Sequence, residues 1–223
     1  VNEEVTTTLD YGFDYSGSLH YGIDAHFHAP FKMNDHVETY VVQEAIWDRG
    51  EGRGSLSKQV GKSYSADGVH LCTVETYDCC IYDGGFGGER PPKDVVEYPD
   101  REPDLAYEEV CGYQWPLIYR LMGDWHQQHI DWAYTEQTGL ARPINHGVCT
   151  AGIAMRHLIA LLIPGQPERL RRFKCRFTSP VLPGTRLCTQ VWKMGEGEAR
   201  FRVVDADDGA ARPSLNFCLA EWE

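Results

Sequence analysis

An aspartate and a histidine five positions apart are the residues of this sequence best suited to proton transfer. Asp124 and His129 lie in a stretch rich in glycine and aromatic residues, from Leu121 to Asp131. An imidazole titrates near neutral pH, and a carboxylate can orient it or share its proton, so the two form a candidate acid–base pair. Considered singly, each also has a structural interpretation: Asp124 as a turn cap and His129 as a hydrogen-bonded, semi-buried histidine.

A glycine at the start of a predicted helix is a third candidate. The sequence from His146 to Ile163 predicts a helix, because apolar residues recur on one stripe and Pro164-Gly165 ends it. The stripe consists of Thr150, Ile153, Ala154, Leu158 and Leu161. Gly147 opens this helix, where the backbone N–H groups are unpaired and the helix dipole is positive. A substrate oxygen that gains negative charge would be stabilised there. The alternative, a close-packed turn glycine, is compatible with that role.

Both regions fit a motif of a known family. The sequence resembles the hydratase 2 motif of MaoC-like (R)-specific 2-enoyl-CoA hydratases, in which Gly-Asp-x-Asn-Pro-x-His is followed by Arg-Pro-Ile-x-His-Gly. Gly123, Asp124 and His129 fit the first part, and residues 142–147 fit the second. The sequence departs from the family at residues 126–128, so that the first part reads Asp-x-His-Gln-x-His.

The resemblance extends to the two-repeat members of this family. Trp-Asp-Arg-Gly at 47–50 and Gly-Gly-Phe-Gly-Gly at 84–88 recur at similar places in them. Taken alone, the glycine cluster is better interpreted as a flexible strand end than as a phosphate loop, because neither a lysine nor a helix follows it.

The resemblance implies a hydro-lyase that interconverts enoyl-CoA and (3R)-hydroxyacyl-CoA, without a metal or another cofactor. Asp124 and His129 would be its catalytic dyad and hold one water molecule between them. The Gly147 N–H would belong to the oxyanion hole. His126 and Gln127 would bind substrate at a more polar and bulkier edge of the site, so that a specialised acyl thioester or a related small molecule is also expected.

Two further functions remain open. One is a hot dog lyase or cyclase of specialised, polyketide-like metabolism, for which the thioester is not required. The other is a weakly catalytic acyl-binding subunit that completes the active site of a partner. The histidine at position 126 favours both alternatives, whereas an intact Asp124 and His129 weigh against the second.

A basic stretch at residues 169–177 is the exception to an acidic composition. Its alternation predicts a strand with apolar residues on one face and Arg172, Lys174 and Arg176 on the other. The basic face is either a solvated surface or a cradle for the phosphates of a carrier such as coenzyme A. On the second interpretation these three residues bind substrate.

The C-terminal half predicts an antiparallel sheet wrapped around one helix. Strand-like segments follow the helix near 169–178, 185–194, 198–205 and 213–222, and a further helix is predicted at 108–121. The pattern is consistent with an α+β class, and the resemblance implies the hot dog fold. It also implies paired sheets, as in a two-repeat monomer or a dimer of such chains, and a homodimer is expected.

The N-terminal half predicts strands near 36–49, 53–66 and 69–82, without a comparable long helix. We therefore predict a double hot dog fold with a degenerate N-terminal repeat at 1–88, a linker at 89–105 and a catalytic repeat at 106–223. The first repeat is short for this fold, so the natural chain is expected to extend further at its N-terminus.

Composition narrows the class of protein. The 223 residues are 42% hydrophobic and 24% charged, which is typical of a globular protein, and no apolar run is long enough to span a membrane. A net charge of -12 argues against nucleic acid binding. The eight cysteines form no Cys-x-x-Cys pair, which favours reduced thiols and a cytoplasmic location. His26 and His28 lack cysteine or carboxylate partners at ligand spacing, so no metal is expected.

Overall fold

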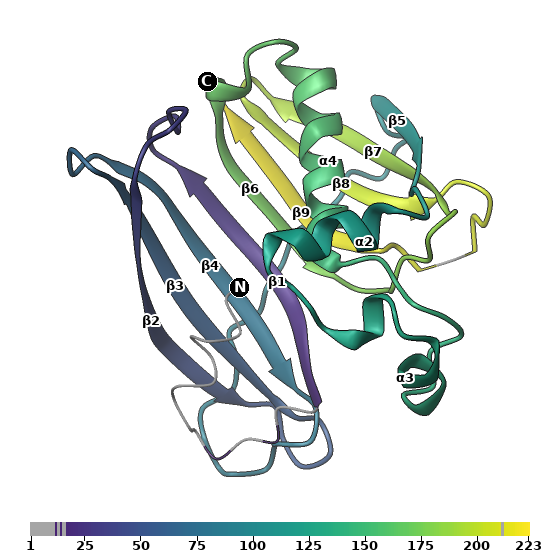
Figure 1. Ribbon diagram of the computed structural model, residues 1–223. Coiled ribbons are helices and arrows are strands. Elements are labelled where there is room, and N and C mark those ends of the chain that lie inside the picture. The colour runs from purple at the N-terminus through teal and green to yellow at the C-terminus, as the bar shows by residue number, and fades with distance from the viewer. Residues whose placement is uncertain (1–11, 13, 15–16, 211) are drawn as a thin grey trace.

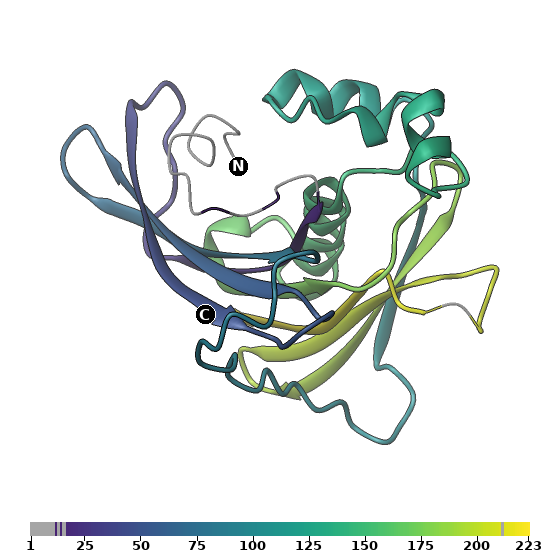
Figure 2. The same cartoon turned by 90° about the horizontal axis from the view of Figure 1, so that it is seen from below.

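A curved antiparallel sheet with one long helix in its hollow forms the framework of the protein (Figures 1 and 2). The computed structural model describes residues 12, 14, 17–210 and 212–223. The strands are β1 (Ser18–Phe27), β2 (Val37–Asp48), β3 (Ser55–Ser65), β4 (His70–Cys80), β5 (Leu105–Val110), β6 (Leu170–Phe177), β7 (Arg186–Gly195), β8 (Glu198–Asp205) and β9 (Leu215–Trp222). The helices are α2 (Trp115–Tyr119), α3 (Trp132–Gln137) and α4 (Gly147–Leu162), with the short 3₁₀ turns η2 (Arg120–Met122), η3 (Gln127–His129) and η4 (Pro167–Arg169). This is the predicted α+β class.

The two halves of the chain meet at one seam in the sheet. The strand order is β2-β3-β4-β1-β6-β9-β8-β7-β5, so β1 and β6 are the neighbours that join them. In this antiparallel pair Gly22 lies opposite Arg176, and His26 lies opposite Arg172. The division into repeats 1–88 and 106–223 with a linker at 89–105 stays a prediction, and residues 1–11, 13, 15 and 16 of the first repeat lie outside the described residues.

Helix α4 confirms the long helix predicted from His146 to Ile163. It lies across the strands of the C-terminal half (Figure 1), where its buried stripe packs against fully buried side chains such as Phe173 and Phe201. Burial of one such side chain contributes about 1.5–3 kcal/mol. This packing therefore fixes where the N-terminus of α4 points. Among the described residues, no helix is both long and apolar enough to cross a membrane.

The N-terminal half contributes strands but little to this core. Residues 18–114 are all described and form no helix, in agreement with the missing long helix predicted there. Within the described chain, this half reaches the core cluster only through Ile23 and Phe27 of β1. The predicted strands are confirmed as β2–β4 in this half and as β6–β9 in the other.

The segment between β4 and β5 runs along the outer face of the sheet, away from α4 (Figure 2). The Tyr98 hydroxyl donates to the Phe201 carbonyl at 2.9 Å and accepts from the Cys218 N–H at 3.0 Å. Asp94 pairs with Lys174 at 2.5 Å. These contacts tie the segment to the C-terminal half of the sheet.

The helix predicted at 108–121 is wrong in its first part. Residues 105–110 form β5, an edge strand paired with β7, and their burial alternates with a period of two. The helix starts only at Trp115, with Pro116 in its first turn. N–H groups in the first turn of a helix have no intrahelical acceptor, so a proline there costs no hydrogen bond. Pro116 therefore lies at the start of this helix and does not bend it. Strand β1 was also not predicted.

The two glycine-containing stretches that carried the family resemblance in the N-terminal half bind each other. The buried Asp48 carboxylate accepts hydrogen bonds from the N–H groups of Gly50 at 2.7 Å, Gly85 at 2.8 Å and Gly87 at 2.8 Å. These hydrogen bonds lower the pKa of Asp48, and the bond from Gly85 has the largest effect. The glycine cluster therefore has a structural role, because its backbone N–H groups donate hydrogen bonds to Asp48.

Candidate active site

Short turns between α2 and α4 position Asp124. Gly123 ends η2 with a φ of 108°, a backbone conformation that glycine adopts without strain. Asp124 Oδ1 then accepts a hydrogen bond from the His126 N–H at 3.3 Å. Arg120 donates from Nη1 to the Trp125 carbonyl at 2.7 Å. The hydrogen bonds of the His126 N–H and of Arg120 thus stabilise the turn that carries the Asp124 carboxylate.

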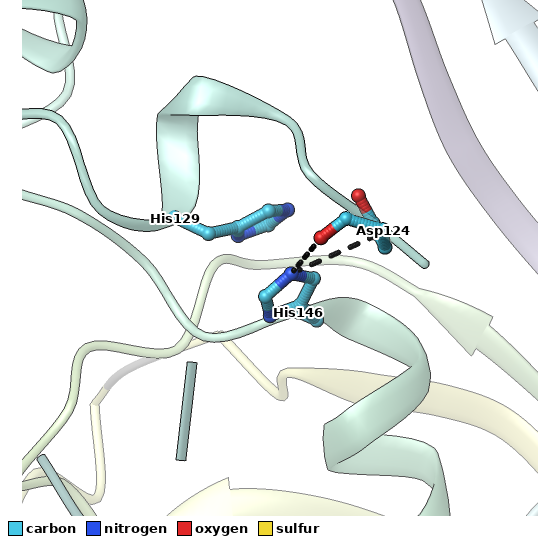
Figure 3. A group of neighbouring side chains, drawn as sticks. All are labelled: Asp124, His129 and His146. Atoms are coloured by element: carbon cyan, nitrogen blue, oxygen red, sulfur yellow. Dashed lines mark hydrogen bonds and ion pairs between the residues drawn. The ribbon is translucent and has the colours of Figure 1, made fainter. Parts of the chain in front are cut away.

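Asp124, His129 and His146 form one cluster beside the N-terminus of α4 (Figure 3). One carboxylate or imidazole atom of each residue lies within 4.8 Å of the other two. A single water molecule could therefore hydrogen-bond to two of them at once. Both histidines are buried, whereas the Asp124 side chain is 39% exposed. The structure thus brings the predicted pair, Asp124 and His129, together at a cluster open to solvent on its carboxylate side.

Hydrogen bonding defines which nitrogen of His129 is basic. Its Nδ1 lies 2.9 Å from the Ile144 carbonyl oxygen, so Nδ1 carries the proton and donates it to that bond. Nε2 is then the acceptor nitrogen, and it accepts a hydrogen bond from the Gln128 side-chain amide at 3.2 Å. Burial is the main reason that the pKa of His129 lies below its usual value of 6.5. His129 is therefore neutral at pH 7 and can accept a proton at Nε2.

His146 belongs to this cluster although it was not predicted as a site residue. Its Nε2 lies 3.3 Å from the Asp124 carbonyl oxygen and 3.9 Å from Oδ2 of the same residue. Its ring stacks on that of His129, and the Tyr119 ring lies 4.5 Å away. Burial lowers the pKa of His146 as well. The sequence signal for His146 was its place in the motif immediately before Gly147.

Gly147 lies where the site meets the seam of the sheet. A Cβ atom on this residue would lie 3.0 Å from Cδ1 of Phe177, which is closer than most real contacts. No described residue accepts a hydrogen bond from the N–H groups of Gly147, Val148 or Cys149 in the first turn of α4. Glycine therefore fits here without displacing Phe177, and unpaired donors remain beside the cluster, as the predicted oxyanion role requires.

The residues that depart from the family motif form η3 and its cap. His126 is the N-cap, because its Nδ1 accepts a hydrogen bond from the Gln128 N–H at 3.3 Å. Its ring also lies against those of Tyr134 at 5.4 Å and His129 at 6.2 Å. The Gln127 residue is exposed. The imidazole of His126 thus borders the cluster, and its role in substrate binding stays a prediction.

The basic strand is not brought to this cluster. Phe173 and Cys175 of β6 are buried on the side of α4, so the alternating Arg172, Lys174 and Arg176 face the outer side of the sheet. Arg172 pairs with the buried Asp24 at 2.7 Å and with Glu221 at 3.1 Å. Lys174 pairs with Asp94. The alternation is confirmed, whereas the role of these residues as a phosphate cradle stays a prediction.

His20 of β1 reaches the site from the N-terminal half. Its ring lies 4.8 Å from that of Phe177, the residue that packs on Gly147. Its Nε2 is buried, with no hydrogen-bond partner among the described residues. Burial lowers the pKa of His20 to about 4, an effect that the Asp124 carboxylate opposes. Nothing in the local sequence of His20 indicated this position, because it depends on the pairing of β1 with β6.

The three clustered side chains are of types that bind metals, but their orientation does not fit one well. The His129 and His146 rings stack at 3.6 Å with 23° between their planes. Nearly parallel rings direct their in-plane lone pairs side by side rather than toward one point. Nδ1 of His129 is also used by the Ile144 carbonyl. The arrangement is better suited to holding water than to coordinating a metal ion.

Comparison with known proteins reveals relatives over nearly the whole chain. Residues 96–211 match the family described as MaoC like domain. The 3-hydroxyacyl-thioester dehydratase Y of Mycobacterium tuberculosis is 34% identical over 216 residues, which are 94% of this chain and 74% of that protein.

Solved structures with similar folds confirm the predicted architecture. A MaoC-like dehydratase from Phytophthora capsici superposes with a TM-score of 0.83 and 25% identity, over 94% of this chain and 73% of that one. A Mycobacterium tuberculosis protein described as a double hot dog fold superposes with a TM-score of 0.57 and 13% identity, over 91% and 74%. The fold is accordingly a double hot dog fold.

Proposed function

Because this chain belongs to the MaoC-like dehydratase family, we propose that it is a hydro-lyase that adds water to the 2,3 double bond of an acyl thioester or removes it. The observation that carries this proposal is the cluster of Asp124 and neutral His129 beside the free N–H groups of α4. It combines a proton acceptor, a carboxylate and oxyanion donors in one place.

In the hydration direction, a water molecule replaces the Gln128 amide at His129 Nε2 and is held between this nitrogen and Asp124. One group takes a proton from this water as its oxygen bonds to C3, and a proton is delivered to C2, so that one water is added in total. Negative charge builds up on the thioester oxygen, where the Gly147 N–H and the α4 dipole stabilise it. Dehydration follows the same steps in reverse. Both parts of the water add to the same face of the double bond, and the family resemblance predicts the face that gives the (3R)-hydroxyacyl product.

His146 is a positioning residue in this scheme. It stacks on His129 and contacts the backbone of Asp124, so it sets the spacing of the two groups. His126 and Gln127 form the polar edge past which the acyl group enters. This edge supports a polar or bulky acyl group, with coenzyme A as the expected carrier.

A direct test is incubation of the purified protein with enoyl-CoA substrates that have short, long and polar acyl chains. Mass spectrometry should detect the gain of one water in at least one product, and chiral analysis should give the (3R) isomer. Asp124→Asn is the matched negative control. Failure to hydrate any substrate, with 3-hydroxyacyl-CoAs also unchanged, would instead favour an acyl-binding subunit without activity of its own.

We also infer a homodimer and a cytoplasmic location. Exposed apolar side chains gather around the site segment, including Leu121, Met122 and Trp125. Burial of such a patch against a second copy is favourable. All eight cysteines are free thiols, which is typical of a reducing compartment. Sedimentation of the purified protein tests the dimer, and localisation of a tagged protein tests the compartment.

A further inference from the structure

A cavity on the outer face of the sheet lies at the seam between the two halves. It has a volume of ≈ 330 Å³, and we call it the seam pocket. Its floor is formed by β1 and β6, and the segment between β4 and β5 forms one wall. The residues used below are Tyr21, Trp47, Arg49, Lys93, Lys174 and Arg176. The seam pocket is separated from the Asp124 cluster by the sheet, because α4 packs on the opposite face.

Three cations of the seam pocket have no acidic partner. Arg49, Lys93 and Arg176 form no salt bridge within the described part of the chain, whereas Lys174 is paired with Asp94. Other lysines and arginines of the described chain also lack a salt bridge, so the distinguishing feature of these three is that they line one cavity. Unpaired cations that share one cavity favour the binding of an anion.

Aromatic rings hold these guanidinium groups in place. The Arg176 guanidinium lies 4.2 Å from the ring centroid of Tyr21 and 4.9 Å from that of Phe217. The Arg49 guanidinium lies 5.8 Å from the same Tyr21 ring and donates to the Cys79 sulfur. Both groups are therefore oriented before a ligand arrives, which reduces the entropy lost on binding. Trp47 adds a further aromatic wall.

We propose that the seam pocket binds a small organic anion that carries a planar ring, such as an aromatic carboxylate or an aromatic phosphate monoester. The guanidinium groups and Lys93 bind the anionic group, and the ring packs against Trp47 and Tyr21. The volume is at the lower end of the range for ligand pockets, about 300–1,000 Å³. A complete acyl-CoA is too large for it, so the ligand is not the proposed substrate.

Such a ligand would join the two halves of the protein. Arg49 follows β2 in the N-terminal half, whereas Arg176 belongs to β6 in the C-terminal half. Within the described residues the strands of the two halves are hydrogen-bonded to each other only at the β1–β6 pairing, and an anion held by both arginines adds a second link. Binding should therefore raise the thermal midpoint and slow amide hydrogen exchange at Gly22 and Ile23. This inference does not rest on the proposed hydratase activity.

The test uses benzoate and phenyl phosphate as probes, with benzamide as the neutral counterpart of benzoate and inorganic phosphate as an anion without a ring. Titration calorimetry on the full chain should show benzoate or phenyl phosphate binding at least about tenfold more tightly than benzamide and inorganic phosphate, and more weakly as salt rises. Equal binding of benzamide, or no binding of either aromatic anion, would overturn the proposal.

Variants then place the binding at the seam pocket. Arg176→Gln should weaken probe binding by about tenfold, the effect of losing one charge-assisted hydrogen bond. Lys93→Gln, at an exposed position outside the sheet, should weaken it without risk to folding. Arg171→Gln on the same strand is the matched control, because Arg171 pairs with Glu223 and does not line the pocket. Asp124→Asn should also retain full affinity. Unchanged affinity in both Arg176→Gln and Lys93→Gln would contradict the assignment.

Discussion

The imidazole rings of His129 and His146 stack with their centroids 3.6 Å apart. Two protonated rings at this distance would repel each other, so the stack favours the neutral forms. This agrees with the effect of burial, which lowers the pKa of both residues. The site is therefore built around uncharged imidazoles beside one carboxylate, and its behaviour with pH follows from that.

Acid should destabilise the protein below pH 6.5. The folded-state pKa of His129 lies below the unfolded value of about 6.5. As the pH falls below 6.5, the unfolded chain therefore binds more protons than the folded protein, and the free energy of unfolding decreases. Each pKa unit between the folded and unfolded values lowers the free energy of unfolding by up to about 1.4 kcal/mol. Urea unfolding at pH 7 and pH 5 should show this loss, and His129→Gln should reduce it. Equal acid sensitivity in His129→Gln and the unsubstituted protein would contradict the buried neutral form.

Removal of either member of the dyad should abolish most turnover. Asp124→Asn and His129→Ala are each expected to lower kcat by about a hundredfold to ten-thousandfold, the usual contribution of a general acid–base group. The double variant should lose little more than the worse single variant, because the two groups share one water. Steady-state kinetics and circular dichroism of all three variants provide the measurement. Turnover close to that of the unsubstituted enzyme in either single variant would exclude this dyad.

Two glycines of α4 allow a matched test of the oxyanion site. Gly147→Ala would place a Cβ 3.0 Å from Phe177, so either that ring or the first turn of α4 must shift. We expect kcat to fall at least about tenfold, because the N–H groups would move from the thioester oxygen. Gly152→Ala meets open space in the same helix and should keep its activity, with up to about 1 kcal/mol more stability from helix propensity. Equal kinetics in the two variants would remove Gly147 from the mechanism.

Much of the C-terminal half was predictable because its signals are local. The apolar stripe and Pro164-Gly165 define α4, and the alternation at 170–177 defines β6. The pair Asp124 and His129 was found through a motif within a few residues of sequence. His20, by contrast, reaches the site only through strand pairing across more than one hundred residues, which local patterns do not encode.

The carboxylate partners of the basic residues were also beyond local prediction. Alternation correctly assigned Arg172, Lys174 and Arg176 to the face opposite the apolar residues, but it could not say which acidic residues would lie beside them. Asp24, the buried partner of Arg172, lies on β1 and is distant in sequence. Tertiary pairing therefore decides whether such cations are available for a ligand.

The two interpretations of Arg172 and Lys174 predict different kinetics. A phosphate cradle would raise KM for CoA thioesters when both are changed to Gln, with kcat retained. Because both already hold carboxylates on the outer face, we expect KM to change less than about twofold. Arg172→Gln should instead destabilise the fold by about 1–3 kcal/mol, since the buried Asp24 loses its partner. Kinetics measures the first effect and urea unfolding the second. A steep, salt-dependent rise in KM would instead support the interpretation of these residues as a phosphate cradle.

Position 126 offers the sharpest test of substrate preference. His126 caps η3 through its Nδ1, and an asparagine oxygen can accept the same hydrogen bond. His126→Asn, which restores the family residue, should therefore keep the fold of the turn, whereas His126→Ala removes the cap as well as the ring. Differences between the asparagine and alanine variants separate the capping role from the role of the imidazole.

If the imidazole of His126 contacts the acyl group, His126→Asn should preserve or raise activity on crotonyl-CoA. It should lower kcat/KM for a polar or bulkier enoyl-CoA by about tenfold, the effect of one lost hydrogen bond in the transition state. We expect this change in preference because Gln127 and Gln128 depart from the family motif together with His126. The ratio of kcat/KM for the two substrates measures it directly. A ratio that stays constant in His126→Asn would show that the residue only caps the turn.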